Sequence, residues 1–225
     1  MKKIIFPLFL ALTLISCDKE DSEDVNQDKI YTDYEMFYNE NTDMTTVVAR
    51  FRFGGATGTL LELSSGANVK FNGDVLAYNG WYGGHMKEYA GEIAPGTFVY
   101  TDVNGSIYTN TAPSNNPIAF DPAFDTIVKS QANTCAWLGS SLQANEAVAL
   151  FVGSWTWGQD ALFYQDLDGA TDFVMGVSQL SGLAEGTSTM YMDRYTALNI
   201  SQGTSEGGRI RNKYRAINQQ VLVLP

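Results

Sequence analysis

Short stretches in which apolar and polar residues alternate recur along most of the chain. Across residues 45–53, Ala49 and Phe51 alternate with Arg50 and Arg52, which is the period-two pattern of a half-buried strand. Similar runs predict strands at residues 31–38, 59–63, 68–71, 75–78, 96–101, 106–109, 126–129, 146–152, 161–165, 172–177, 187–195, 208–216 and 219–224. No apolar stripe has helical spacing, and one short helical turn is expected within residues 180–186. The pattern predicts an all-β protein.

The spacing of these runs predicts how the strands are grouped. Residues 29–111 contain about seven of them, which suits an immunoglobulin-like β-sandwich. The Asn- and Pro-rich residues 112–118 have no apolar periodicity and predict a linker, followed by a second β-sandwich over residues 119–225. The last two runs are expected to form a hairpin through Asn218. Two tandem immunoglobulin-like sandwiches are therefore expected, with one larger β-sandwich as the alternative.

The N-terminal residues 1–16 have the pattern of a secretory signal peptide. Lys2 and Lys3 precede an almost wholly apolar run over residues 4–16. At about 1.5 Å per residue, this run is too short to cross the ~30 Å hydrocarbon core of a bilayer as a helix. We expect it to direct export and then to be removed.

Leu14-Ile15-Ser16-Cys17 ends this apolar run and resembles the lipobox of bacterial lipoproteins. The resemblance covers only these four residues and their flanks. It implies cleavage before Cys17 and acylation of that cysteine, so that two or three fatty-acid chains such as palmitate anchor the protein to a membrane. The alternative is an ordinary secretory signal peptide followed by a cysteine that is there by chance.

Residues 17–28 are expected to form a solvated tether, because they are rich in acidic side chains and nearly devoid of apolar ones. The acidic run after Cys17 also looks like the signal by which some Gram-negative bacteria export lipoproteins across the outer membrane. That likeness implies an outer-membrane lipoprotein facing the cell exterior. A charged spacer on a periplasm-facing lipoprotein is the alternative.

Charge and cysteine content narrow the range of functions. The net charge of −11 argues against nucleic acid as a partner, because proteins bind phosphates through Lys and Arg. Once Cys17 is acylated, only Cys135 remains, so no intramolecular disulfide is possible. Cys135 lies close to Trp137 and Leu138, which predicts a buried, unreactive thiol.

Motifs for catalysis are scarce in this sequence. His85 is the only histidine, and no serine lies in a Gly-x-Ser-x-Gly motif. Its neighbours Gly83 and Gly84 predict an exposed histidine in a loop or at a strand edge. A zinc site built from several His and Cys residues is excluded by their number, and no cofactor is expected. We therefore expect that the protein is not an enzyme. A glycan hydrolase that uses two carboxylates is the least favoured alternative.

One acidic segment is a weak candidate for calcium binding. Asp166 and Asp168 precede Gly169, and closely spaced carboxylates around a glycine turn provide the oxygen ligands that calcium prefers. The segment lacks the closing glutamate of an EF-hand loop. An ordinary acidic turn is the favoured interpretation.

Two aromatic pairs are candidates for ligand binding. Trp155 and Trp157 are two residues apart, so they would face the same side of a strand, and Trp81 and Tyr82 lie in a glycine-flanked loop. Exposed aromatic rings stack on sugars or on the apolar surface of a partner. The alternative is that the tryptophans fill a core or plug a hairpin.

A group of basic residues is a further candidate. These residues alternate with other residue types and would share one face of a strand in an otherwise acidic chain: Arg209, Arg211, Lys213 and Arg215. Such a face suits an anionic glycan, a lipopolysaccharide phosphate or an acidic partner. The alternative is a solvated outer face whose charges oppose edge-to-edge aggregation.

These observations together predict a non-catalytic lipoprotein at the cell surface that acts in binding, adhesion or envelope structure. A glycan-binding accessory lipoprotein of a nutrient-uptake system is the alternative. The expected partners are a membrane, through the lipid anchor, and a glycan or an envelope protein.

Overall fold

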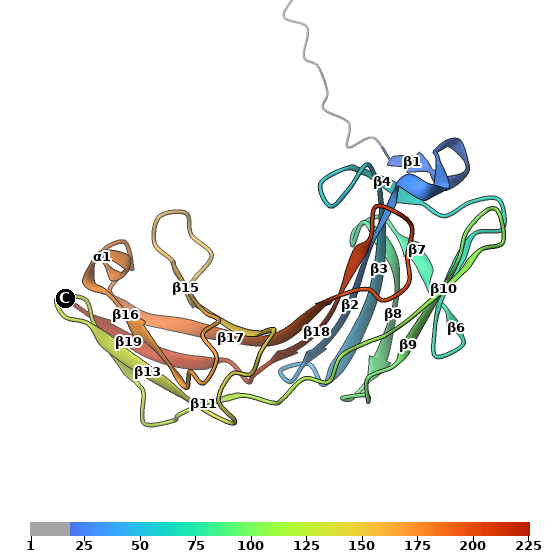
Figure 1. Ribbon diagram of the computed structural model, residues 1–225. Helices are drawn as coiled ribbons and strands as arrows, with labels where there is room; N and C mark the ends of the chain where they lie inside the picture. Colours follow the sequence, from blue (N-terminus) through green and yellow to red (C-terminus); the bar gives the residue numbers. More distant parts are fainter. Residues whose placement is uncertain (1–18) are drawn as a thin grey trace, which may run out of the picture.

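The computed structural model describes residues 19–225, so the signal peptide and Cys17 predicted from the sequence lie outside the described residues. The expectation of an all-β protein is confirmed. Within residues 19–225 the structure consists of strands, two 3-10 turns and one four-residue α-helix, α1 (Val177–Leu180). Figure 1 shows two lobes joined by long strands into an open arch. No helix among the described residues has the length and apolar character needed to span a bilayer.

The first lobe contains parts of two sheets. Its share of the large sheet consists of β1 (Lys19–Asp21), β2 (Ile30–Asn39), β3 (Met44–Phe53), β4 (Thr59–Glu62), β7 (Ala77–Asn79) and β8 (Gly84–Ala90). A four-stranded sheet covers it and consists of β5 (Asn68–Phe71), β6 (Asp74–Val75), β9 (Thr97–Thr101) and β10 (Ile107–Thr111). The core lies between these sheets, where the rings of Tyr34 and Phe98 stack at 4.5 Å.

The second lobe has the same two-layer arrangement. Its share of the large sheet consists of β12 (Thr126–Val128), β14 (Glu146–Gly153), β15 (Ala161–Gln165), β17 (Gly186–Asn199), β18 (Gly208–Arg215) and β19 (Gln219–Leu224). The opposing layer consists of β11 (Ala119–Phe120), β13 (Asn133–Leu138) and β16 (Asp172–Met175). Trp137 and Phe173 pack edge to face within the second core, at 5.4 Å between ring centroids.

One sheet runs through both lobes. Its strand order is β1-β4-β3-β2-β18-β17-β14-β15, with β18 parallel to β2 and antiparallel to β17. Ile210 of β18 belongs to the first core, whereas Tyr214 of the same strand belongs to the second. The two predicted sandwiches therefore share a strand and a sheet, and their independence as domains stays a prediction.

The predicted hairpin of the last two strands is wrong. β18 pairs with residues 193–199 of β17, and β19 pairs with residues 186–190 of the same strand. Because β17 is 14 residues long, β18 and β19 both pair with it, at different positions along its length. They therefore do not pair with each other as a hairpin. Sequence patterning also missed β8, β11 and β13.

The first described residues contact the sheet, although the sequence predicts a solvated tether over residues 17–28. β1 pairs in parallel with β4, and Ser22 and Gln27 are buried. The Gln27 amide donates hydrogen bonds to the carbonyls of Ser22 and Val25. Polar bonds hold this segment in place, which an analysis of apolar periodicity does not detect.

The predicted linker, residues 112–118, crosses the outer side of the arch between β10 and β11 (Figure 1). The Asn115 amide donates to the carbonyl of Arg194 at 3.0 Å, and the Asn212 amide donates to the carbonyl of Pro113 at 2.9 Å. These bonds attach the crossing segment to β17 and β18.

Candidate binding face

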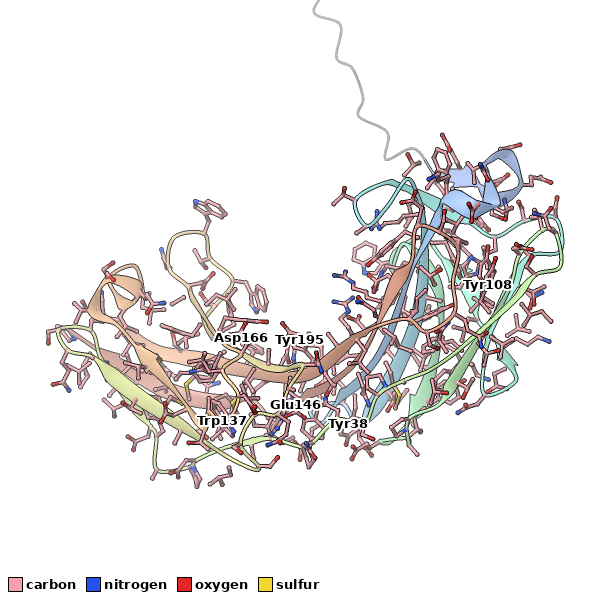
Figure 2. The ribbon with its side chains drawn as sticks, in the orientation of Figure 1. Tyr38, Tyr108, Trp137, Glu146, Asp166 and Tyr195 are labelled. Atoms are coloured by element: carbon pink, nitrogen blue, oxygen red, sulfur yellow. The ribbon has the colours of Figure 1, made fainter. Side chains whose placement is uncertain are left out.

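Side chains of the large sheet that point away from both cores line the inner side of the arch, and we call this surface the concave face. Figure 2 shows Tyr195 on the inner side, with Trp137 and Glu146 on the outer side. The strand register aligns Arg211 with Glu35 and Ala197, and Lys213 with Phe37 and Tyr195. The face therefore continues without interruption from the first lobe to the second.

The four basic residues of β18 all lie on the concave face, as their spacing suggests. β18 lies between β2 and β17 in the interior of the sheet. It therefore has no free edge for these charges to protect. Their contacts with neighbouring strands determine what the face can bind.

Carboxylates on β2 pair with the first two cations. The guanidinium of Arg209 donates to both oxygens of Asp33, at 3.1 and 2.8 Å. Arg211 reaches Asp33 at 3.2 Å and Glu35 at 3.1 Å. Arg50 of β3 lies 3.7 Å from Glu35.

A carboxylate on β17 pairs with the other two cations. Lys213 lies 2.8 Å from Asp193, and Arg215 donates to both Asp193 oxygens at 2.6 and 2.8 Å. Burial alone would raise the pKa of Asp193, but hydrogen bonds from Arg215 and Lys213 outweigh burial and lower it. The hydrogen bond to Asp193 raises the pKa of Arg215 in turn.

The network contains five cations and three carboxylates, so the centre of the concave face carries an excess of two positive charges. Each carboxylate is shared between at least two cations. Guanidinium groups keep further N–H donors beyond those used in the pairs, since each has five. The result is a surface with a small positive excess, most of whose charges are paired, that is dense in fixed hydrogen-bond donors and acceptors.

A hollow of about 400 Å³ opens beside this network. Ala149 and Ala197 line it together with Arg209 and Arg211, and their short side chains leave the space open. On the second-lobe side, the hydroxyls of Tyr195 and Tyr164 are joined by a 2.8 Å hydrogen bond. Burial and this bond raise the pKa of Tyr195 further above physiological pH than that of an ordinary tyrosine.

Exposed aromatic rings border the face in the second lobe. Trp155 and Trp157 lie in the loop that follows β14, and not on a strand as their spacing suggested. Trp155 stacks on Phe151 at 4.1 Å, and Trp157 is completely exposed. Trp157 and Phe151 also line an apolar hollow of about 400 Å³ with Leu162.

The other aromatic pair borders the same face in the first lobe. Trp81 is 94% exposed in the turn between β7 and β8. The Tyr82 carbonyl accepts a hydrogen bond from Arg50 at 3.2 Å, and its side chain lines a hollow of about 340 Å³ with Phe37 and Met44. Tyr82, the Trp155–Trp157 pair and the basic residues, separate in sequence, therefore lie on or beside one surface.

The remaining sequence candidates lie elsewhere. Asp166 and Asp168 are exposed in a turn, and no group of acidic, His or Cys side chains in residues 19–225 is placed to hold a metal ion. His85 is buried, which corrects the expectation of an exposed residue. Its Nε2 accepts a hydrogen bond from the Leu63 amide, and burial lowers its pKa. Cys135 is buried as expected, and burial raises its thiol pKa to about 12.

Six further residues complete the face and were not predicted from the sequence: Asp33, Glu35, Phe37, Tyr164, Asp193 and Tyr195. A signal for three of them was present, because Asp33, Glu35 and Phe37 alternate along one predicted strand. The sequence did not reveal that this strand, β2, pairs with β18, the strand that carries the four basic residues.

No family model matches the chain, and no curated protein matches it either. One solved structure that resembles it is described as "Structural insight into host cell surface retention of a 1.5-MDa bacterial ice-binding adhesin", with 12% identity and a TM-score of 0.26. The match covers 86% of this chain and 65% of that chain. The protein thus spans less than two thirds of the length of that neighbour.

Proposed function

We propose that the protein is a non-catalytic, lipid-anchored surface protein that binds a glycan chain on its concave face. The observation that carries this proposal is one continuous sheet face with paired charges at its centre and exposed aromatic rings bordering it at both ends. Aromatic rings stack on the apolar faces of sugars. Paired guanidinium and carboxylate groups donate to and accept from hydroxyls in fixed directions.

The charge balance favours a neutral or mildly acidic glycan. Bare cations would select phosphate or sulfate, but the cations of β18 are largely neutralised by Asp33, Glu35 and Asp193. A hydroxyl-rich ligand does not need to displace those carboxylates. Several sugar units in a row could contact the arch from Tyr82 to Trp157.

A glycan-array screen with the mature protein tests this proposal. We expect saturable binding that weakens at least tenfold in Tyr195→Ala, in Trp157→Ala and in Arg209→Gln. Trp157 and Arg209 are well exposed, so these two variants should fold normally. Tyr108→Ala, on the four-stranded sheet of the first lobe, is the matched aromatic control and should bind like the unchanged protein.

A protein partner is the second candidate, and a specific feature favours it. The second lobe exposes large apolar side chains close together in β15 and the loops beside it, among them Trp157, Leu162 and Leu167. Exposed apolar patches mark protein interfaces. Absence of binding to any glycan, together with cross-linking of intact cells through this lobe, would replace the glycan proposal with an adhesion role.

The anchor is tested separately. Cys17→Ser should abolish incorporation of radiolabelled fatty acid and move the protein to the soluble fraction. A variant that stays in the membrane fraction would contradict lipid anchoring through Cys17. Protease shaving of intact cells would then distinguish a protein on the cell exterior from one that faces the periplasm.

A further inference from the structure

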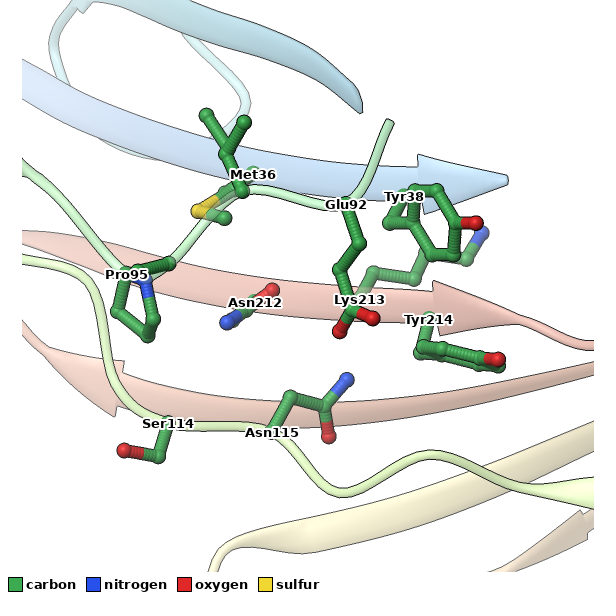
Figure 3. Close-up of a pocket in the computed structure, with 11 residues that line it drawn as sticks. Met36, Tyr38, Glu92, Pro95, Ser114, Asn115, Asn212, Lys213 and Tyr214 are labelled. Atoms are coloured by element: carbon green, nitrogen blue, oxygen red, sulfur yellow. The ribbon is translucent and has the colours of Figure 1, made fainter. Parts of the chain in front are cut away.

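A hollow also lies on the outer face of the large sheet, between the two cores, and we call it the waist pocket (Figure 3). Its volume is about 360 Å³, within the usual range of small-molecule sites. β2 contributes Met36 and Tyr38, and β18 contributes Asn212 and Tyr214. The loop after β8 and the crossing segment, residues 112–118, complete the walls, so the pocket exists only because distant parts of the chain meet here.

Two tyrosine rings form one side of the waist pocket. The rings of Tyr38 and Tyr214 lie 5.4 Å apart and are tilted by 58°. Met36 and Pro95 add apolar surface on the opposite side of the pocket (Figure 3). The pocket therefore offers aromatic faces to a ligand instead of a purely polar lining.

Apart from the Ser114 hydroxyl, which can also donate, the free polar groups of the pocket are hydrogen-bond acceptors. Asn212 is only 7% exposed, and its amide nitrogen is committed to the Pro113 carbonyl. Within residues 19–225, the amide oxygen of Asn212 accepts no hydrogen bond, and the Glu92 carboxylate has neither an ion-pair nor a hydrogen-bond partner. A ligand that brings hydrogen-bond donors would give both of these acceptors a partner.

The charge around the waist pocket is negative. Tyr214 donates to Glu40 and Tyr38 donates to Asp43, each at 3.0 Å, and Glu92 lies near both hydroxyls. Lys213 is the one cation among the lining residues. Its ammonium is on the concave face, 2.8 Å from Asp193.

We propose that the waist pocket binds a small organic cation with an ammonium or guanidinium group. The tyrosine faces attract the cation through their ring quadrupoles. The Glu92 carboxylate and the Asn212 amide oxygen accept hydrogen bonds from its N–H groups. This site is on the opposite side of the sheet from the concave face, so the two proposals stand or fall separately.

Titration of the mature, ¹⁵N-labelled protein with putrescine, a simple diamine, tests the proposal. We expect saturable shifts of the side-chain amide signals of Asn115 and Asn212, with weaker binding at high salt because the attraction is electrostatic. Glu92→Gln should weaken binding at least fivefold. Glu92 is in an exposed loop, so this variant should fold normally.

Glu20→Gln is the matched control, because it removes one exposed negative charge from β1, far from the pocket (Figure 1). It should bind putrescine like the unchanged protein. Equal weakening by Glu92→Gln and Glu20→Gln would show attraction to net charge alone and would overturn the site. The cation site would also be overturned if glucose caused the same shifts as putrescine. It would be overturned likewise if neither compound caused any shift.

Discussion

At the scale of single residues, the ion pairs of the concave face make stability depend on pH. The pKa of Asp193 in the folded protein lies below its ordinary value of 3.8, because hydrogen bonds from Arg215 and Lys213 outweigh the effect of burial. A carboxyl group with a lowered pKa stabilises the fold above its unfolded-state pKa. That contribution is lost as the pH falls through the folded-state pKa.

Asp193→Asn should therefore lower the free energy of unfolding at pH 7 by about 1.5 to 3 kcal/mol, the typical value for hydrogen bonds to a charged group. The difference from the unchanged protein should shrink as the pH falls through the lowered folded-state pKa of Asp193, because Asp193 itself then becomes protonated. Urea unfolding at several pH values measures this. Asp168→Asn, at an exposed turn, is the control and should change the free energy of unfolding little. A difference for Asp193→Asn that does not vary with pH would contradict the role of its ion pairs.

The burial of single residues could be predicted from the sequence at Cys135 but not at His85. The burial of Cys135 followed from its apolar neighbours. The exposure of His85 was inferred from glycines beside it, and the structure contradicts it. Residues 84–90 form β8, and the ring of His85 faces the first core against Phe51 and Tyr78. Local glycines indicated a turn correctly but not which face of the next strand was buried.

At the scale of elements, alternation located most strands, because a half-buried sheet exposes every second residue. Pairing was much harder to predict. β18 and β19 are consecutive in sequence, and yet both pair with β17. The reason is that β17 is long enough to pair with both strands, and the sequences of β18 and β19 do not reveal its length. The concave face was missed for the same reason, since it depends on β2 lying beside β18.

A buried ion pair joins three elements on the outer side of the sheet. Arg194 of β17 is completely buried and pairs with Glu146 of β14. Its guanidinium also donates to the carbonyls of Ser140 and Ser141 at 2.8 and 3.0 Å. Glu146 in turn accepts from Asn116 of the crossing segment at 3.0 Å. This network has no periodic signal in the sequence.

Glu146→Ala should lower the free energy of unfolding by about 3 to 5 kcal/mol, because it leaves the Arg194 charge buried without a partner. Chemical denaturation measures the loss. The matched control is Lys129→Met, which breaks the more exposed Lys129–Glu185 pair and should cost no more than about 1 kcal/mol. Equal losses in the two variants would mean that water reaches Arg194.

At the scale of the whole molecule, the shared sheet opposes the independence that the sequence predicts for two sandwiches. Each core is large enough to have its own stability, but β18 contributes Ile210 to one core and Tyr214 to the other. Unfolding of the first lobe would remove β2 from β18, and unfolding of the second lobe would remove β17 from it. We therefore expect the two lobes to unfold in one cooperative transition.

Trp137 makes this testable, because it is buried in the second core whereas the other three tryptophans are exposed. Its fluorescence therefore reports chiefly on the second lobe. Leu61→Ala removes a fully buried side chain from the first core and should cost about 2 to 5 kcal/mol. If the lobes are coupled, this distant substitution lowers the denaturation midpoint seen by Trp137 fluorescence as much as the midpoint seen by far-ultraviolet circular dichroism.

Leu150→Ala, in the second core, is the control that must move the fluorescence midpoint in either case. A Leu61→Ala variant whose fluorescence midpoint stays in place, while its circular dichroism shows an earlier transition, would establish two independent domains. A common midpoint would mean that the arch is one folding unit. In that case the concave face is held in a single shape, because the strands on which a ligand lies cannot separate without unfolding both cores.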